Sequence, residues 1–263
     1  MQRPIHSERA KVVSLLALSC VMTLVTGMPG PARAADTKDA TPILDSAIKA
    51  LGGEEKLGKV KAASWKSSGT ITFQGSDNQA SSQFFVQGLD HFRQEFEGDF
   101  GGNMIKGVTV VAGDKGWRGF GGNNMAMDKS AIADTKRTAY LIWVPITILP
   151  LKSADFKVET IAEQTIGGKP AVGVKATAPD GKEFNLYFDK ESSLPVRLVA
   201  KVTGFMGDEF TQETTFSDYQ EIAGIKKATK LSSKRDGEKF IDQQITDFKV
   251  LDPIDAKLFA EPQ

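Results

Sequence analysis

From residue 65 onward, apolar and polar side chains mostly alternate along the chain, which is the pattern of β-strands with one buried face. Segment 183–188 is a clear example, because Phe184, Leu186 and Phe188 recur at every second position. Turn-forming sequences separate about eleven such segments. These are 65–74, 83–96, 104–112, 116–120, 156–165, 171–178, 183–188, 195–202, 209–219, 225–235 and 239–251.

Two Asp-Gly pairs in this region predict tight hairpins. Asp180-Gly181 and Asp236-Gly237 each lie between two predicted strands. A type I′ turn needs positive φ at both central positions, which Asp and Gly adopt readily. Both pairs are therefore expected to form two-residue type I′ turns.

Elsewhere the pattern changes to the period of an α-helix. Segment 41–51 starts with Thr41 as the expected N-cap and stops at two consecutive glycines. A shorter helical turn is expected at 54–61. Asp128 is expected to cap a mid-chain helix that runs to about residue 142. A last helical turn is expected close to the C-terminus.

These elements predict a mainly β (α+β) fold. So many strands and so few helices cannot form a sheet that helices cover on both faces. An open antiparallel sheet of this size twists and curls. We therefore expect a strongly curved antiparallel sheet, with helices partly filling its apolar concave side. Because no repeat or linker divides the chain, 35–263 is predicted to be a single domain.

The N-terminal 1–34 has the composition and order of a secretory signal peptide. Basic residues come first, and the uncharged run 12–26 follows. That run has 15 residues, whereas a membrane-spanning helix needs about 20, so an uncleaved anchor is the weaker alternative. Cleavage is expected after Ala34, which removes Cys20 and leaves a periplasmic protein.

The composition excludes several classes of function. The chain has 33 basic and 33 acidic residues and a net charge of zero, whereas a nucleic-acid-binding protein needs a basic surplus. One cysteine cannot form an internal disulfide or a cysteine zinc site. Two histidines, His6 and His91, are too few for a histidine metal cluster. We therefore predict no nucleic-acid partner, no metal and no cofactor.

No catalytic motif is present either. The sequence contains neither the serine nucleophile elbow nor a phosphate-binding loop. His91 could act as a general base with Asp90 or Glu95. However, neighbouring strand residues point to opposite faces, so Asp90 is not expected to orient it. We predict that the protein is not an enzyme and has no catalytic residues.

Segment 141–151, LIWVPITILPL, is the most informative part of the chain. Pro145 and Pro150 are expected to prevent a regular helix or a central strand here. One interpretation is a buried exit of the mid-chain helix, because most apolar runs are core. The other is an apolar lid over the concave side of the sheet, where an acyl chain would bind.

Under the lid interpretation, several aromatic and aliphatic side chains are candidates for ligand contact, although each could instead be ordinary core. They are Leu141, Trp143, Ile146, Phe84, Phe85, Trp117 and Phe120.

The strands near the C-terminus are rich in lysine. Most such charge clusters form a solvated surface. An attraction to anionic lipid headgroups, and hence a peripheral membrane contact, is the functional alternative. The residues concerned are Lys226, Lys227, Lys230, Lys234, Arg235 and Lys239.

The order of elements and a series of short phrases resemble the LolA-like group of exported bacterial proteins, which are related to the outer-membrane lipoprotein carriers. The resemblance covers nearly all of 41–262. It implies an unclosed β-barrel with a helical lid over an apolar cavity that holds lipid or acyl chains. The phrases are LGG at 51–53, LPL at 149–151, LYFDK at 186–190, LPVR at 194–197, FSDY at 216–219, GI at 224–225, ID at 254–255 and LF at 258–259.

Three hypotheses for function follow. The first is a periplasmic protein that binds lipid or lipoprotein acyl chains, with the role in envelope lipoprotein or lipid sorting that the resemblance implies. The second is an envelope sensor or assembly module that binds a protein partner through a sheet edge or the basic C-terminal hairpin. The third is a hydrolase that uses His91.

Overall fold

The computed structural model describes residues 39–204 and 207–263. The predicted signal peptide, its cleavage site after Ala34 and Cys20 lie outside these ranges. The helical elements are α1 (Thr41–Leu51), α2 (Glu54–Lys59), α3 (Lys129–Thr147), η1 (Leu149–Lys152) and η2 (Ala256–Phe259). The strands are β1 (Ala62–Phe73), β2 (Ser76–Gln87), β3 (His91–Phe100), β4 (Asn103–Ala112), β5 (Lys115–Phe120), β6 (Asn123–Ala126), β7 (Lys157–Ile166), β8 (Lys169–Thr177), β9 (Glu183–Asp189), β10 (Pro195–Thr203), β11 (Glu209–Ile222), β12 (Ile225–Arg235) and β13 (Glu238–Leu251).

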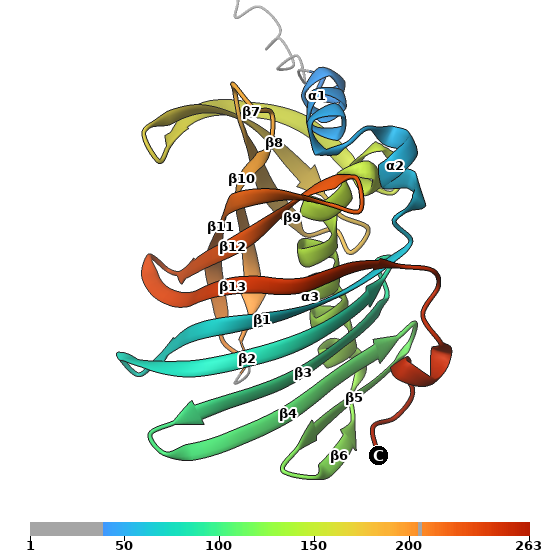
Figure 1. The fold of residues 1–263 in the computed structure, drawn as a ribbon, viewed down its shortest axis with the longest axis vertical. Helices are drawn as coiled ribbons and strands as arrows, with labels where there is room; N and C mark the ends of the chain where they lie inside the picture. The colour runs from blue at the N-terminus through green and yellow to red at the C-terminus, as the bar shows by residue number, and fades with distance from the viewer. Residues whose placement is uncertain (1–38, 205–206) are drawn as a thin grey trace, which may run out of the picture. The chain divides into compact units, whose positions relative to one another are not determined.

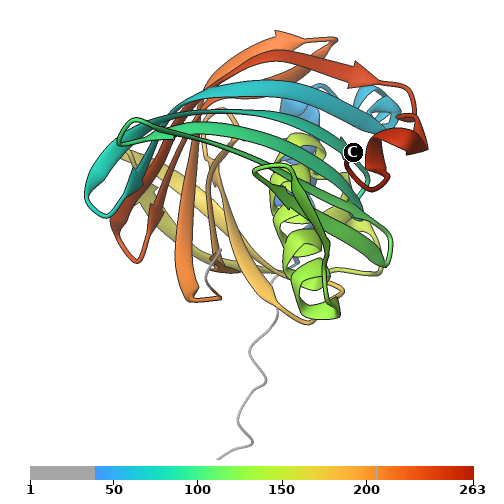
Figure 2. The ribbon, with the colours of Figure 1, turned by 90° about the horizontal axis from the view of Figure 1, so that it is seen from below.

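In the described ranges, thirteen strands form one antiparallel sheet in the order β6-β5-β4-β3-β2-β1-β13-β12-β11-β10-β9-β8-β7 (Figure 1). The chain makes one series of hairpins outward from β1 to β6 and a second series from β7 back to β13, which pairs with β1. The sheet is strongly curved, and α3 lies on its concave side (Figure 2). The predicted mainly β fold with a curved antiparallel sheet is confirmed.

The alternation pattern failed in two places: it did not separate β2 from β3, and it did not recognise β6. The predicted strand 83–96 is wrong, because a turn at 88–90, with Gly88 at φ 63°, divides it into β2 and β3. Strand β6 was missed because it has only four residues after a glycine turn. Short strands give too few alternations to stand out from the neighbouring turns.

One of the two predicted type I′ turns is confirmed. Asp236 and Gly237 both have positive φ and join the paired residues on either side. In the other hairpin only Gly181 has positive φ. Pro179 precedes Asp180, and its ring fixes φ near −65°, so the turn starts at the proline and Gly181 closes a longer loop.

Helix α3 begins as predicted but extends further than predicted. Asp128 caps it, with its Oδ1 accepting from the Ala131 backbone N–H at 2.8 Å. The expectation that Pro145 prevents a regular helix is wrong, because α3 continues to Thr147. Proline removes one hydrogen bond within the last turn. From residue 139 onward nearly every side chain is buried, and this packing outweighs the loss.

The core lies between the concave face of the sheet and the helices α1 and α3. In β1 and β2, Trp65 and Phe84 stack with ring centroids 5.0 Å apart. Apolar residues of α1, including Leu44, Ile48 and Leu51, belong to the same cluster. Each buried aliphatic side chain contributes about 1.5–3 kcal/mol, so the helices and the sheet stabilise one another.

The corner after α1 permits a specific test of this packing. Gly52 has φ 137°, and a Cβ on it would lie 2.8 Å from the Gly224 carbonyl oxygen in the β11–β12 turn. Gly53 has φ 90° but open space around it. We expect Gly52→Ala to lower the free energy of unfolding by about 1–3 kcal/mol more than Gly53→Ala does. Urea unfolding of the two variants measures the difference, and equal midpoints would contradict the close approach.

Candidate functional site

Four of the seven predicted ligand-contact residues come together. Leu141, Trp143 and Ile146 project from α3, and Phe84 projects from β2. All four are at most 9% exposed and belong to one core cluster. In this conformation they fill the space between α3 and the sheet with their own side chains.

Phe85 and Trp117 face away from this cluster. Backbone pairing places Phe85, Arg93, Val110 and Trp117 in one row across β2 to β5. Successive strand residues point to opposite faces, so this row is on the convex side when Phe84 is on the concave side. The C-terminal segment crosses the same face, where Arg93 Nη1 donates to the Leu258 carbonyl at 3.1 Å.

Phe120 lies on the concave side but away from the cluster. It is the last residue of β5, directly before the turn to β6, and it is 48% exposed. The seven residues therefore divide into a buried group at α3, a convex pair and one residue at a hairpin tip.

The surface of the described residues includes two clefts of similar size. One of about 440 Å³ lies between α1, α2 and the β11–β12 turn, and another of about 460 Å³ runs along the middle of β1 to β4. Neither is lined by any of the seven predicted residues. Because buried side chains fill the space between α3 and the sheet, a ligand would fit there only if this helix moved.

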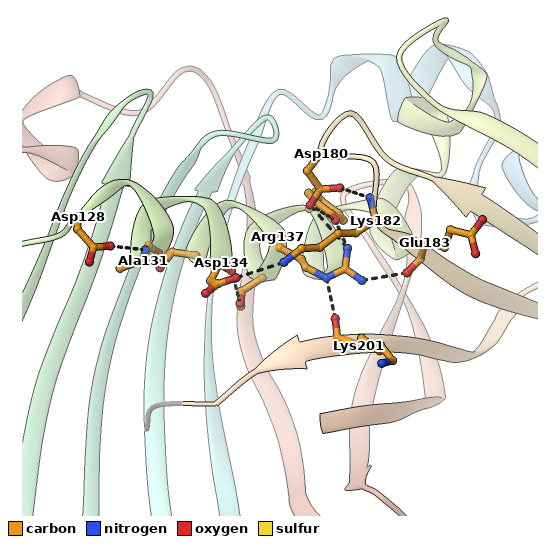
Figure 3. A network of polar contacts seen from close by, with 11 residues as sticks. Asp128, Ala131, Asp134, Arg137, Asp180, Lys182, Glu183 and Lys201 are labelled. Atoms are coloured by element: carbon orange, nitrogen blue, oxygen red, sulfur yellow. Dashed lines mark hydrogen bonds and ion pairs between the residues drawn. The ribbon is translucent and has the colours of Figure 1, made fainter. Parts of the chain in front are cut away.

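Arg137 of α3, which the sequence did not single out, links the helix to the sheet (Figure 3). Its side chain is buried, at 2% exposure for the residue. Nε donates to the Lys201 carbonyl of β10 at 2.7 Å, and Nη2 donates to the Glu183 carbonyl of β9 at 2.9 Å. One arginine therefore joins α3 to two neighbouring strands.

Tyr140 and Asp180 complete this group, which we call the Arg137 latch. Arg137 Nη1 hydrogen-bonds to the Tyr140 hydroxyl, which donates to Asp180 Oδ2 at 2.8 Å. Asp180 Oδ2 is also 3.7 Å from Arg137 Nη1. Burial, together with the hydrogen bond to Asp180, raises the pKa of Tyr140, so its hydroxyl stays protonated and available as a donor.

A second polar contact lies beside the latch. Lys182 Nζ donates to Asp134 Oδ1 of α3 at 3.4 Å, and the Lys182 backbone N–H donates to Asp180 Oδ1 at 2.9 Å (Figure 3). Polar contacts thus hold the middle of α3 to the start of β9 and the end of β10. Lys136 of α3 also pairs with Asp114 in the β4–β5 turn, and the C-terminal half of the helix is held by apolar packing.

The sequence contained one signal for the latch. Arg137, Tyr140, Leu141 and Val144 are spaced so that they share one face of a helix. A cation on the face that also carries the apolar run is unusual, because buried arginines need several partners. Two of its four partners are backbone carbonyls, which no motif identifies.

Lys227 of β12 corrects the view of the C-terminal lysines as a solvated surface. It is 6% exposed, and Nζ donates to the Ala228 carbonyl at 3.0 Å and lies 5.7 Å from the centre of the Phe248 ring. Among the described residues, no carboxylate forms an ion pair with it. Burial lowers the pKa of Lys227 to about 7.

Two more cations of this hairpin are not free in solvent. Arg235 lies over the Phe240 ring at 3.6 Å and near the Phe210 ring at 5.1 Å, and burial lowers its pKa to about 10. Lys239 forms an ion pair with Asp77. Lys226, Lys230 and Lys234 are exposed and, among the described residues, form no ion pair, so an attraction to anionic lipid would depend mainly on these three.

His91 contacts Asp90, contrary to the prediction. The His91 Nδ1 to Asp90 Oδ1 distance is 2.8 Å, because Asp90 belongs to the turn before β3 and is free of the strand alternation. The imidazole packs edge-on against Phe259 of η2, with centroids 5.3 Å apart. His91 therefore lies on the convex side, remote from α3.

Within 39–204 and 207–263, no cluster of three or more His, Cys, Asp or Glu side chains could hold a metal ion. None of the helices in these ranges has the length and hydropathy needed to span a bilayer.

No protein-family model and no curated protein sequence matches the chain. Solved structures do match. The LolA superfamily protein NE2245 from Nitrosomonas europaea matches with a TM-score of 0.55 and 11% identity, over 84% of this chain and 97% of that one. The chain has a LolA-like fold.

Two further structures agree with this assignment. A DUF1329 family protein from Desulfovibrio piger matches with a TM-score of 0.54 and 12% identity, over 85% of this chain and 98% of that one. A domain from Vibrio parahaemolyticus, described as an outer membrane lipoprotein-sorting protein, matches with a TM-score of 0.50 and 11% identity, over 84% and 97%. At these identities the likeness establishes the LolA-like fold alone.

Proposed function

We propose that this protein is exported and binds acyl chains of lipids or lipoproteins between α3 and the concave face of its sheet. The observation that carries the proposal is the covering of an apolar concave face by one helix that a polar latch holds in place. Leu141, Trp143, Ile146 and Phe84 would contact the ligand once α3 moves aside.

Burial of apolar surface would supply the affinity. Each methylene moved from water into an apolar site contributes about 0.8 kcal/mol. An acyl chain of ten or more carbons could therefore replace the contacts that α3 loses on opening. The groups of the Arg137 latch would become accessible to water, which satisfies them when the hydrogen bonds to β9 and β10 break.

The end of α3 offers a place for this movement. Ile148, directly after the helix, has φ 62°, a conformation that β-branched residues rarely adopt. It is fully buried, and its N–H donates to the Val144 carbonyl at 2.8 Å. Such backbone strain, of order 1–3 kcal/mol, is often found at moving segments.

The alternative, a module that binds a protein partner through a sheet edge, has less support from the geometry. The edge strand β7 carries an irregularity between Ile161 and Gln164, and the other edge, β6, has four residues. Bulges and short strands are features that hinder strand addition. The neighbour described as a lipoprotein-sorting protein also favours the acyl-chain proposal.

Native mass spectrometry, followed by organic extraction, tests the proposal directly. The predicted mature chain, 35–263, would be purified gently from periplasm. A bound mass that extracts as phospholipid or acyl chain is the expected result. A protein that arrives empty and takes up no added fatty acid would refute acyl-chain binding.

A disulfide lock tests whether α3 must move. A Cβ on Gly116 of β5 would lie 3.0 Å from Ile132 Cγ1 of α3, so Gly116→Cys with Ile132→Cys places two thiols close together. The predicted mature chain has no cysteine of its own. We expect the oxidised variant to take up a fluorescent fatty acid at least about tenfold more slowly than the same variant after reduction. Equal uptake rates would show that α3 is not the lid.

A further inference from the structure

Three successive hairpins, β1–β2, β3–β4 and β5–β6, end in the same kind of tip. Each has a phenylalanine as the last residue of its first strand, namely Phe73, Phe100 and Phe120. The two turn residues that follow each phenylalanine have positive φ. The values are 50° and 77° for Gln74-Gly75, 64° and 87° for Gly101-Gly102, and 56° and 84° for Gly121-Gly122. These are type I′ geometries, which hold the phenylalanine at a fixed place beside the turn.

The three phenylalanines lie on the same face of the sheet. In β1, Phe73 is eight positions after the core residue Trp65, and in β3, Phe100 is eight positions after the core residue Phe92. Because residues an even number of positions apart in an uninterrupted strand face the same side, both phenylalanines lie on the concave side. Phe120 follows Gly116, which faces α3, by an even number as well. In Figure 1 the three tips lie along one side of the sheet.

The tips are apolar, partly exposed and organised. Phe73 is 56% exposed and Phe120 is 48% exposed. The Phe73 and Phe100 rings meet edge to face with centroids 6.1 Å apart. Large aromatic side chains are rarely left this exposed in adjacent hairpins unless the surface has a function.

The tips themselves carry no charged side chain. The segments 73–76, 100–103 and 120–123 contain no Asp, Glu, Lys or Arg. Of the nearest carboxylates, Asp77 pairs with Lys239, and Asp99 accepts from the Gly102 N–H at 2.7 Å. The tips can therefore leave water without stripping a charge of its hydration.

We propose that these three tips dock the protein on a lipid bilayer, with the Phe73, Phe100 and Phe120 rings entering the boundary between headgroups and acyl chains. Aromatic side chains favour this region. Because the tips carry no charged side chain, they offer no ionic contact that would select a protein partner. They can instead enter the apolar boundary of an uncharged bilayer. The inference goes beyond the proposed function and stands independently of it.

Vesicles of phosphatidylcholine alone test the proposal, because they offer no net charge to the exposed lysines of β12. We expect the predicted mature protein to co-sediment with these vesicles. The Phe73→Ser/Phe120→Ser double variant should partition at least about tenfold more weakly. Leu258→Ser is the matched control, because Leu258 is 36% exposed and belongs to the C-terminal segment that crosses the convex side. It should bind like the unaltered protein.

Three results would overturn the inference: no binding by the unaltered protein, unchanged binding by the double variant, or an equal loss with Leu258→Ser. A fluorescent label defines the orientation. Ser76→Cys, at the β1–β2 tip, should report an apolar environment when vesicles are added, whereas Glu191→Cys, in the β9–β10 turn, should not. A change at position 76 that depends on protein concentration without vesicles would indicate a second copy of the chain instead, and would also overturn it.

The same variants separate this inference from acyl-chain binding. The double variant should still take up a soluble fluorescent fatty acid, since neither residue belongs to the cluster at α3. A protein that binds vesicles and no fatty acid would support the docking tips and refute the proposed function. A protein that binds fatty acid and no vesicles would support the proposed function and refute the docking tips.

Discussion

Replacing Arg137 by methionine is expected to lower the free energy of unfolding by about 3–5 kcal/mol. Methionine keeps a straight apolar stem but cannot donate to the Lys201 and Glu183 carbonyls. Asp180 would also lose the cation next to it. The variant should therefore leave several buried polar groups of α3, β9 and β10 without partners.

Urea unfolding measures this effect, and Lys136→Met is the matched control. Lys136 is the neighbouring residue of α3, and its ammonium pairs at the surface with Asp114 at 3.1 Å. Its removal should change stability by less than about 1 kcal/mol. If the two variants unfold at the same urea concentration, the latch does not stabilise the closed position of α3.

The Arg137→Met variant also has a functional readout. If α3 is a lid, a weakened latch should speed the uptake of a fluorescent fatty acid by about tenfold or more, because the closed state is less favoured. Unchanged uptake in a folded variant would restrict the role of Arg137 to stability.

Lys227→Met is expected to stabilise the protein by roughly 1–4 kcal/mol at pH 7, because an apolar side chain replaces a buried amine that has no carboxylate partner. The Phe248 ring and the Ala228 carbonyl offset only part of the desolvation of the ammonium. Lys226→Met is the matched control, since Lys226 is the adjacent residue and is exposed. It should leave stability nearly unchanged.

The pH dependence of stability has a definite sign. Burial lowers the folded-state pKa of Lys227 to about 7, whereas its ordinary value is 10.5. Between these values the unfolded chain binds a proton that the folded chain has released, so stability rises with pH by up to about 5 kcal/mol across the window. Conversely, stability decreases as the pH is lowered from about 10 towards 7, because the folded protein must then accept a buried charge.

Denaturant unfolding of the unaltered protein and Lys227→Met at several pH values between 7 and 10 checks this slope. The rise of stability with pH that is due to Lys227 should be absent from Lys227→Met and present in Lys226→Met. Parallel pH profiles for all three proteins would mean that Lys227 is solvated in the native state.

Much of the sheet could be predicted because its information is local. Alternation identified most strands, Asp128 marked the start of α3, and the number of one-faced strands required a curved sheet. The failures were also local: Gly88 divides an apparently continuous strand, and Pro145 does not end a helix whose last turns are buried on almost every side.

The candidate site was predicted less completely. Leu141, Trp143, Ile146 and Phe84 meet in the core, but Phe85 and Trp117 lie on the other face of the sheet. The period of two already required Phe84 and Phe85 to separate, as it required Lys226 and Lys227 to separate. A closer use of this rule would have assigned one member of each pair to the interior.

The sequence by itself determined most of the strands, the Asp236-Gly237 turn and the curvature, because these depend on neighbouring residues and on backbone conformations that glycine, aspartate and proline restrict. Only the tertiary structure decided which face of each strand is enclosed, that Lys227 is buried, and that Arg137 reaches carbonyls 46 and 64 positions away. The physical reason is that alternation assigns neighbours to opposite faces without saying which face is covered, and a backbone carbonyl accepts a hydrogen bond whatever residue carries it.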